Sequence, residues 1–308
     1  MPRTSASSPS PALIRASRRS LHVMSFNIRY DRPAAQPDDV DYWPDRIAPL
    51  QDLLRREVPA VLGVQEALHH QLTAIEAALP PRYRRIGAGR DGGSRGEYSA
   101  IFYDAGRLRL IEWDQFWLSD SPKLIGSSTW GNGVTRIVTW GRFHDSGTDR
   151  EILLVNTHFD HESENARVRS AAAVLDLVRF FRPALPAIVM GDFNSDAGSS
   201  SAYRRFLDSE VLVDAWARAD EHLTPAYGTY PRYDRPVDGG ARIDWILTTP
   251  DVRVRQAAVN TSTLDGRYAS DHAAVQALVD IPPRREEPGA PQPVRRHRDA
   301  RGRGPKSP

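Results

Sequence analysis

The sequence predicts an α/β protein in which β-sheets are covered by helices, within one domain spanning about residues 21–282. Short apolar runs typical of buried strands alternate with segments of helical periodicity. Apolar residues make up 40% of the 308-residue chain, which is enough for a sizeable core. Both ends, residues 1–20 and 283–308, are rich in Pro, Ser, Gly and Arg, and we expect them to be disordered.

Three segments have the spacing of helices: residues 45–58, 69–79 and 163–181. In the first, Ile47, Leu50 and Leu54 recur on one face. The third is followed by Pro183 and Pro186, which end a helical pattern.

Ten apolar or alternating runs predict strands. They are 22–30, 60–67, 97–104, 108–119, 135–145, 151–160, 187–194, 241–250, 252–261 and 272–281. The glycine-rich stretch 89–97 predicts a loop, whose Arg90, Asp91 and Arg95 we expect to border the substrate.

The formal net charge of +2 is unevenly distributed. Residues 21–280 hold 29 basic and 36 acidic residues, a net charge of −7, so the basic character belongs to the two ends. An acidic body does not favour a nucleic-acid groove, and it suits a site that gathers carboxylates for a cation. The chain contains no cysteine, so disulfides and thiolate sites are excluded.

The N-terminus lacks the apolar segment of a secretory signal, and no apolar run approaches the ~20 residues of a membrane span. We therefore expect a cytoplasmic protein without a membrane span, and a monomer.

Polar residues follow the predicted core strands. Asp192 and Asn194 come directly after the apolar run 187–190, and residues two apart on a strand project to the same side. In open α/β sheets, ligands gather at the carboxyl ends of strands. We expect these two side chains to point together into a site.

The same pattern recurs elsewhere in the chain. Asn27, Glu66, His158 and Asp244 each lie in or at the end of an apolar strand, and the pair Asp271–His272 lies at the start of the last one. A single such residue is most simply a hydrogen-bonded turn or core residue. Together they are hard to explain by packing, because each buried polar group needs a partner.

The order and wording of eight segments resemble the endonuclease/exonuclease/phosphatase superfamily. The segments are SFNIR, VQEA, GEYSAIFY, TRIVTW, NTHFDH, GDFN, RIDWI and SDH, between residues 25 and 275. The resemblance implies a DNase I-like, four-layer α/β/β/α sandwich of two mixed sheets. It also implies a divalent metal, usually Mg²⁺ with Mn²⁺ as an alternative, and hydrolysis of a phosphoester.

The resemblance also assigns roles at the metal and the attacking water. Glu66 matches the principal metal carboxylate, and Asn27 and Asp271 match residues that help to hold the metal. Asp192 matches the residue that orients or deprotonates the water, although the metal or a histidine can do this instead. Asn194 matches a neighbour that contacts the phosphate.

Further matches concern the phosphate itself. His272 matches the histidine on the scissile phosphate, and Asp244 the carboxylate paired with it. His158 matches a second active-site histidine, supported by Glu97, and both histidines are expected to be protonated. Arg136 matches a phosphate-binding arginine. Arg167, early in the predicted helix after NTHFDH, is a further candidate for reaching the phosphate.

Several segments, among them MSFNIRYD and NTHFDH, lie nearer the deadenylase and sphingomyelinase side of the superfamily than the abasic-site endonucleases. Our main hypothesis is a phosphodiesterase or phosphatase acting on a small or lipid-linked phosphoester. The alternatives are a nuclease for RNA or single-stranded DNA, in which the basic ends contact phosphates, and a catalytically inactive phosphoester-binding scaffold. Tyr227 and Tyr230 precede RIDWI and are candidates for the pocket wall.

Overall fold

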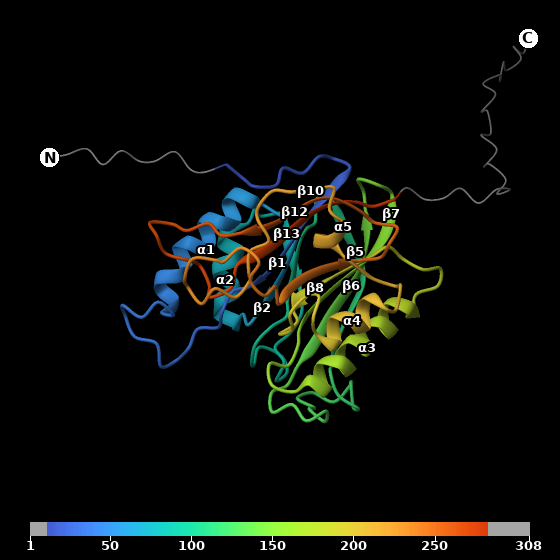
Figure 1. The fold of residues 1–308 in the computed structure, drawn as a ribbon, viewed down its shortest axis with the longest axis horizontal. Coiled ribbons are helices and arrows are strands. Elements are labelled where there is room, and N and C mark those ends of the chain that lie inside the picture. The colour runs from blue at the N-terminus through green and yellow to red at the C-terminus, as the bar shows by residue number, and fades with distance from the viewer. Residues whose placement is uncertain (1–10, 283–308) are drawn as a thin grey trace, which may run out of the picture.

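Two mixed β-sheets lie face to face between two layers of helices in the computed structural model, which describes residues 11–282 (Figure 1). This arrangement confirms the predicted four-layer sandwich. The expected disorder of residues 1–10 and 283–308 lies outside the described residues.

The first sheet has seven strands in the order β10-β12-β13-β1-β2-β4-β3. Its centre is β1 (Ser20–Asn27), which pairs antiparallel with β13 (Ala274–Asp280) and parallel with β2 (Val61–Gln65). The others are β3 (Tyr83–Ile86), β4 (Ile101–Asp104), β10 (Glu221–His222) and β12 (Arg253–Asn260).

The second sheet has six strands in the order β5-β6-β7-β8-β11-β9. They are β5 (Leu108–Trp117), β6 (Ile137–Asp145), β7 (Arg150–His158), β8 (Ala187–Asp192), β9 (Val213–Asp214) and β11 (Asp244–Thr248). In the parallel β7–β8 pair His158 lies beside Asp192, and in the antiparallel β8–β11 pair Asp244 lies beside Asp192. The register therefore brings three candidate residues to one edge.

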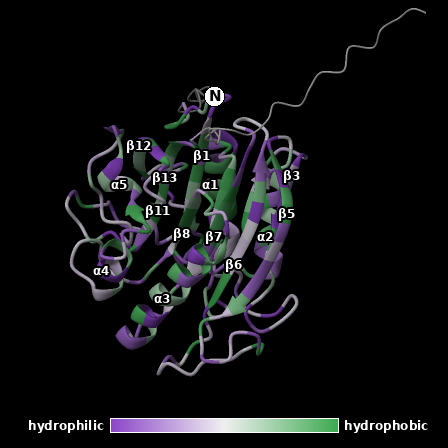
Figure 2. Ribbon diagram, turned by 90° about the vertical axis from the view of Figure 1, so that its right-hand side faces the viewer, coloured by the Kyte–Doolittle hydropathy of each residue, from purple (hydrophilic) through white to green (hydrophobic). Residues whose placement is uncertain are grey.

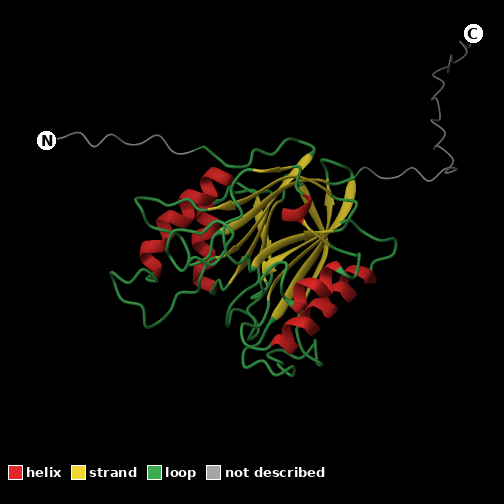
Figure 3. Ribbon diagram, viewed as in Figure 1, coloured by secondary structure: helices red, strands yellow, loops and turns green. Residues whose placement is uncertain are grey.

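Helices cover the outer face of each sheet (Figure 3). The seven-stranded sheet carries α1 (Trp43–Glu57) and α2 (His69–Ala78), and the six-stranded sheet carries α3 (Glu164–Phe180) and α4 (Ser201–Leu207). A short α5 (Ala215–Arg218) contacts β11 and β12. Proline at the first turn starts α1, and the hydroxyl of Ser163 caps α3 by accepting the Ala166 N–H.

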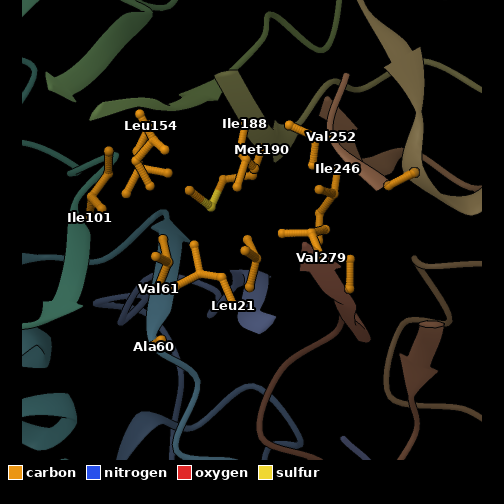
Figure 4. Packing of buried hydrophobic residues seen from close by; sticks show 14 of the residues in the cluster. Leu21, Ala60, Val61, Ile101, Leu154, Ile188, Met190, Ile246, Val252 and Val279 are labelled. Carbon is orange, nitrogen blue, oxygen red and sulfur yellow. The ribbon is translucent and has the colours of Figure 1, made fainter. Parts of the chain in front are cut away.

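Three hydrophobic clusters fill the three interfaces between the layers in the described residues. In the central cluster Leu154 and Ile188 of one sheet face Leu21 and Val61 of the other (Figure 4). Figure 2 shows hydrophobic residues concentrated on the central strands, with hydrophilic residues toward the outer helices and loops. This burial is the main force that presses the two sheets together.

One polar contact crosses the central interface below the candidate site. Asn156 on β7 accepts a hydrogen bond from Gln65 Nε2 at 2.6 Å and donates to the carbonyls of Val64 and Ala100, both at 2.9 Å. Gly63 beside it has no room for a Cβ, which would lie 2.7 Å from Met190 Sδ. These contacts fix how the two sheets sit against each other.

The ordered chain begins before residue 21, where we expected the domain to start. Ile14 is buried, and the backbone N–H groups of Leu13 and Ile14 donate to the carboxylate of Glu57. Five short elements (β3, β9, β10, α4 and α5) were not predicted, because they are too short to show a hydrophobic period.

Candidate active site

A cavity of about 580 Å³ opens where β1, β2, β7 and β8 end. Most of the predicted site residues line it, and Asn27 and Asp244 lie fully buried just behind its wall. Among the predicted catalytic, metal and phosphate residues, Arg167 is the one that the structure places away from it.

Glu66 and Asp271 present carboxylates at one end of this cavity. Glu66 follows β2 with a left-handed φ of 62°, which turns its side chain out of the strand direction. Its Oε1 accepts a hydrogen bond from Asn27 Nδ2 at 2.9 Å. Burial opposes its ionisation, but the charge of His272, the Asn27 amide and Arg29 hold the pKa of Glu66 below its ordinary value.

This end has the donor set for a hard divalent cation. Oxygen atoms of Glu66 and Asp192 lie within 4.8 Å of each other, and Asp271 lines the same cavity. Carboxylate oxygens are the ligands that Mg²⁺ prefers. The Asn27 Oδ1 accepts the Arg29 N–H, and its Nδ2 donates to Glu66 and Asp192. In this arrangement Asn27 orients the two carboxylates, and its expected contact with a cation stays a prediction.

His272 and Asp244 form the predicted pair. The ring Nδ1 lies 2.9 Å from Asp244 Oδ2, and Nε2 lies 3.7 Å from Asp192 Oδ2. Burial disfavours the charged ring, but Asp244 and Asp192 raise the pKa of His272 well above its ordinary value. His272 is therefore an imidazolium whose Nε2–H is available at the cavity.

Asp192, in contrast to the proton donor His272, is placed to accept a proton. It is buried, accepts hydrogen bonds from Asn27 Nδ2 and the Asn194 N–H, and lies beside Asp244. Burial, together with the neighbouring Asp244, raises the pKa of Asp192 to about 7. A carboxylate with such a pKa can accept a proton near neutral pH.

His158 does not pair with Glu97, contrary to the expectation. Its Nε2 lies 3.0 Å from Asn194 Nδ2 and 3.4 Å from Asp192 Oδ2. Glu97 instead forms a 2.8 Å ion pair with Arg90, which lies in the same glycine-rich loop. Burial, with Arg136 and Arg90, holds the pKa of His158 well below its ordinary value, so the expectation of a protonated His158 is also wrong.

The two predicted phosphate arginines differ in position. Arg136 lines the cavity, is buried, and contacts His161 Nδ1 through Nη2 at 3.1 Å. Its Nε has no hydrogen-bond partner within residues 11–282. Arg167 lies on α3, donates to the Asp160 carbonyl at 3.0 Å and pairs with Glu164 at 2.8 Å. These contacts hold Arg167 along its own helix, so it does not reach the cavity.

Sequence reasoning missed two arginines that line the cavity. Arg29 has a left-handed φ of 56° and lies 3.5 Å from Glu66 and 3.7 Å from Asp271. Arg232 lies in the loop before β11. In the glycine-rich loop, Arg90 lines the cavity but Asp91 and Arg95 do not. The only available signal for Arg29 was its place at the end of the SFNIR segment.

Of the two tyrosines considered as wall residues, Tyr230 lines the cavity and Tyr227 does not. The Tyr230 ring lies 4.6 Å from the His272 ring and covers it. Tyr227 packs against the central core.

The fold and the site define a phosphoester-hydrolase-like centre built from carboxylates, two histidines and arginines. The model of the endonuclease/exonuclease/phosphatase family matches residues 24–272, so the chain belongs to this family, whose members are hydrolases of phosphoesters. A comparison with curated proteins gives no match.

Solved structures agree with the family. A family member from Bacteroides thetaiotaomicron is 33% identical, with a TM-score of 0.79, over 85% of this chain and 98% of that one. A mannosyl-6-phosphatase from the same species is also 33% identical, with a TM-score of 0.78, over 85% of this chain and 100% of that one. The human Nocturnin catalytic domain is 19% identical, with a TM-score of 0.66, over 86% of this chain and 96% of that one, and shares the fold.

Proposed function

We propose that the protein is a divalent-metal-dependent phosphatase that hydrolyses small phosphomonoesters, with sugar phosphates as the first candidates. The observation that carries the proposal is the placement of the His272–Asp244 pair, Asp192 and the Glu66–Asp271 carboxylates around one cavity. An acid, a base and a cation site together are what phosphoester hydrolysis needs.

The size and charge of the cavity support a small anionic substrate. A volume of about 580 Å³ falls in the range of small-molecule sites. Arginines on its wall suit a phosphate dianion. The likeness to a protein described as a mannosyl-6-phosphatase supports a sugar phosphate in particular.

Glu66 and Asp271 would hold the cation, with Mg²⁺ as the preferred ion and Mn²⁺ as the alternative. The bound cation supplies Lewis-acid polarisation and charge neutralisation at the phosphoryl group. In the proposed mechanism Asp192 Oδ2 accepts a proton from the attacking water as the water oxygen bonds to phosphorus and the P–O ester bond breaks. The leaving oxygen then takes a proton from solvent water and departs as the alcohol. His272 donates its Nε2–H to a phosphoryl oxygen, and Asp244 keeps the ring charged and oriented.

His158 and Asn194 complete the phosphate pocket in this proposal. Asn194 Nδ2 donates to His158 Nε2 and to the Phe159 carbonyl. The neutral His158 ring then carries its proton on Nδ1, and no donor within residues 11–282 contacts Asn194 Oδ1. Both residues line the cavity, so we expect the pair to contact the substrate phosphate, while Arg136 adds positive charge.

Two alternatives remain as predictions. The nuclease hypothesis depends on the basic ends, of which residues 1–10 and 283–308 lie outside the described residues. The inactive-scaffold hypothesis predicts a damaged set of site residues, and the set here is intact. No helix within residues 11–282 is long and apolar enough to cross a membrane. Cytoplasmic location and a monomeric state stay predictions.

The test is a hydrolysis panel with Mg²⁺, Mn²⁺ or EDTA. The substrates are mannose 6-phosphate, glucose 6-phosphate, bis-(p-nitrophenyl) phosphate, sphingomyelin and a single-stranded oligonucleotide. We expect metal-dependent phosphate release from the sugar phosphates, lost in Glu66→Gln and kept in Glu112→Gln, an exposed change on β5. Faster cleavage of the diester or the oligonucleotide would overturn the phosphomonoester proposal.

A further inference from the structure

Four arginines line the cavity, and one of them is free. Arg90 pairs with Glu97, Arg29 pairs with Asp41, and Arg136 contacts His161. The side chain of Arg232 is exposed, and within residues 11–282 it has neither an ion pair nor a hydrogen bond. It is therefore the cavity cation whose charge is left for a ligand.

The backbone holds Arg232 in place although its side chain is free. Arg232 and Tyr233 have consecutive left-handed φ values of 57° and 66°, which non-glycine residues rarely adopt. The Arg232 N–H donates to the Asp271 carbonyl at 2.9 Å, and the Tyr233 hydroxyl donates to Asp41 at 2.7 Å. The turn is thus anchored both to the residue before His272 and to the loop that precedes α1.

The Arg232 side chain and His272 both contact the Tyr230 ring. The Arg232 guanidinium carbon is 5.1 Å from the Tyr230 ring centre, and the Tyr230 ring is 4.6 Å from His272. The proposed function puts the scissile phosphate at His272, and Tyr230 contacts both His272 and the Arg232 cation. A substrate that reaches both positive charges would therefore lie across the Tyr230 ring, in the cavity that all three residues line.

Another part of the cavity wall carries an ion pair in place of a lone cation. Arg90 and Glu97 are joined by their ion pair and offer donors and acceptors together, which suits neutral hydroxyl groups. A guanidinium without a carboxylate instead matches the two oxygens of a phosphate or carboxylate.

From these contacts we infer that Arg232 binds a second anionic group of the substrate, a phosphate or a carboxylate. The inference rests on the proposed function and narrows it to phosphoesters with a second negative group, such as sugar bisphosphates and phosphorylated sugar acids.

The test compares three substrates that differ in the second group: glucose 6-phosphate, 6-phosphogluconate and glucose 1,6-bisphosphate. We expect kcat/KM for the two doubly anionic substrates to exceed that for glucose 6-phosphate by about tenfold or more. Arg232→Gln should bring this ratio close to one, and Arg232→Lys should restore part of it. Arg235→Gln, an exposed change in the same loop but outside the cavity wall, should keep the wild-type ratio.

A second readout separates this inference from the proposed function. Calorimetry with Asp192→Asn, in EDTA, compares the binding of 6-phosphogluconate and glucose 6-phosphate without hydrolysis. A wild-type ratio near one, or equal affinities in calorimetry, would overturn the role of Arg232. An equal fall in kcat/KM for all three substrates in Arg232→Gln would also overturn it. A different result would separate the two proposals. If no substrate is hydrolysed with metal but 6-phosphogluconate still binds more tightly than glucose 6-phosphate, the proposed phosphatase activity is wrong and the second anion site at Arg232 stands. Titration of glucose 1,6-bisphosphate under the same conditions distinguishes the two groups. If Arg232 prefers a phosphate to a carboxylate, the bisphosphate will bind more tightly than 6-phosphogluconate.

Discussion

Asp192 and Asp244 lie side by side as partners in the antiparallel β8–β11 ladder, and the His272 ring contacts both carboxylates. The contact with Asp244 is a 2.9 Å hydrogen bond, whereas Asp192 is 3.7 Å from the other ring nitrogen. The two aspartates are therefore strand neighbours that have different roles. Asp244 fixes the charged ring, and Asp192 keeps a raised pKa and faces the cavity.

Replacing Asp244 with asparagine should reduce kcat about 10²–10⁴-fold, because the carboxylate that keeps His272 charged and oriented is removed. Steady-state kinetics on the best substrate of the panel measures the loss. Thermal unfolding of the variant controls for misfolding. A folded variant with kcat within a few-fold of wild type would contradict the role given to the pair.

Glu66→Gln should weaken the binding of Mn²⁺ about tenfold or more, because a neutral amide replaces the principal carboxylate of the proposed cation site. Calorimetric titration of the protein without substrate gives the dissociation constant. Glu76→Gln, on the exposed face of α2, is the matched control and should bind like wild type. Equal affinities in the two variants would place the cation elsewhere.

Arg46→Met should lower the free energy of unfolding by about 3 kcal/mol. The buried guanidinium of Arg46 donates to five backbone carbonyls, those of Ile28, Arg29, Tyr30, Asp41 and Ala269. All five would lose a donor in the variant. Urea unfolding measures the change, and Arg55→Met, exposed on the same helix, should cost far less. A similar cost for both would show that the carbonyl contacts add little.

His22 should make the protein less stable in acid. Burial lowers the pKa of this β1 histidine from 6.5 to about 3 in the folded state. Below pH 6.5 His22 is protonated in the unfolded chain but stays neutral in the folded protein. The free energy of unfolding therefore falls as the pH drops toward 3, by up to about 1.4 kcal/mol per pH unit. Urea midpoints between pH 7 and 4 measure the slope, and His22→Leu should make it shallower. An unchanged slope in that variant would assign the acid sensitivity to other groups.

The strand-end pattern predicted much of the site because β-sheet geometry is regular. Parallel β7 and β8 must end at the same edge, so His158 and Asp192 were bound to meet. The reasoning for Asn194 was less accurate. β8 ends at Asp192, and Asn194 reaches the cavity through a left-handed turn, with φ of 47°, and not as the second residue along a strand.

Contacts made by loops could not be predicted from the sequence. The partner of Glu97 depends on how the glycine-rich loop folds back, and it is Arg90 of that loop, not His158. The position of Arg232 depends on a turn anchored to Asp41, far away in the sequence. Neither has a periodic signal, because both arise from tertiary contacts.

The site is assembled across the seam between the sheets. Glu66 and Asn27 extend from the seven-stranded sheet, while Asp192 and Asp244 belong to the six-stranded one. The catalytic rate therefore depends on how the two sheets are aligned at this edge. A core substitution that lets one sheet slide, such as the loss of the Asn156–Gln65 hydrogen bond, would slow the enzyme by misaligning its two halves, even where most of the protein remains folded.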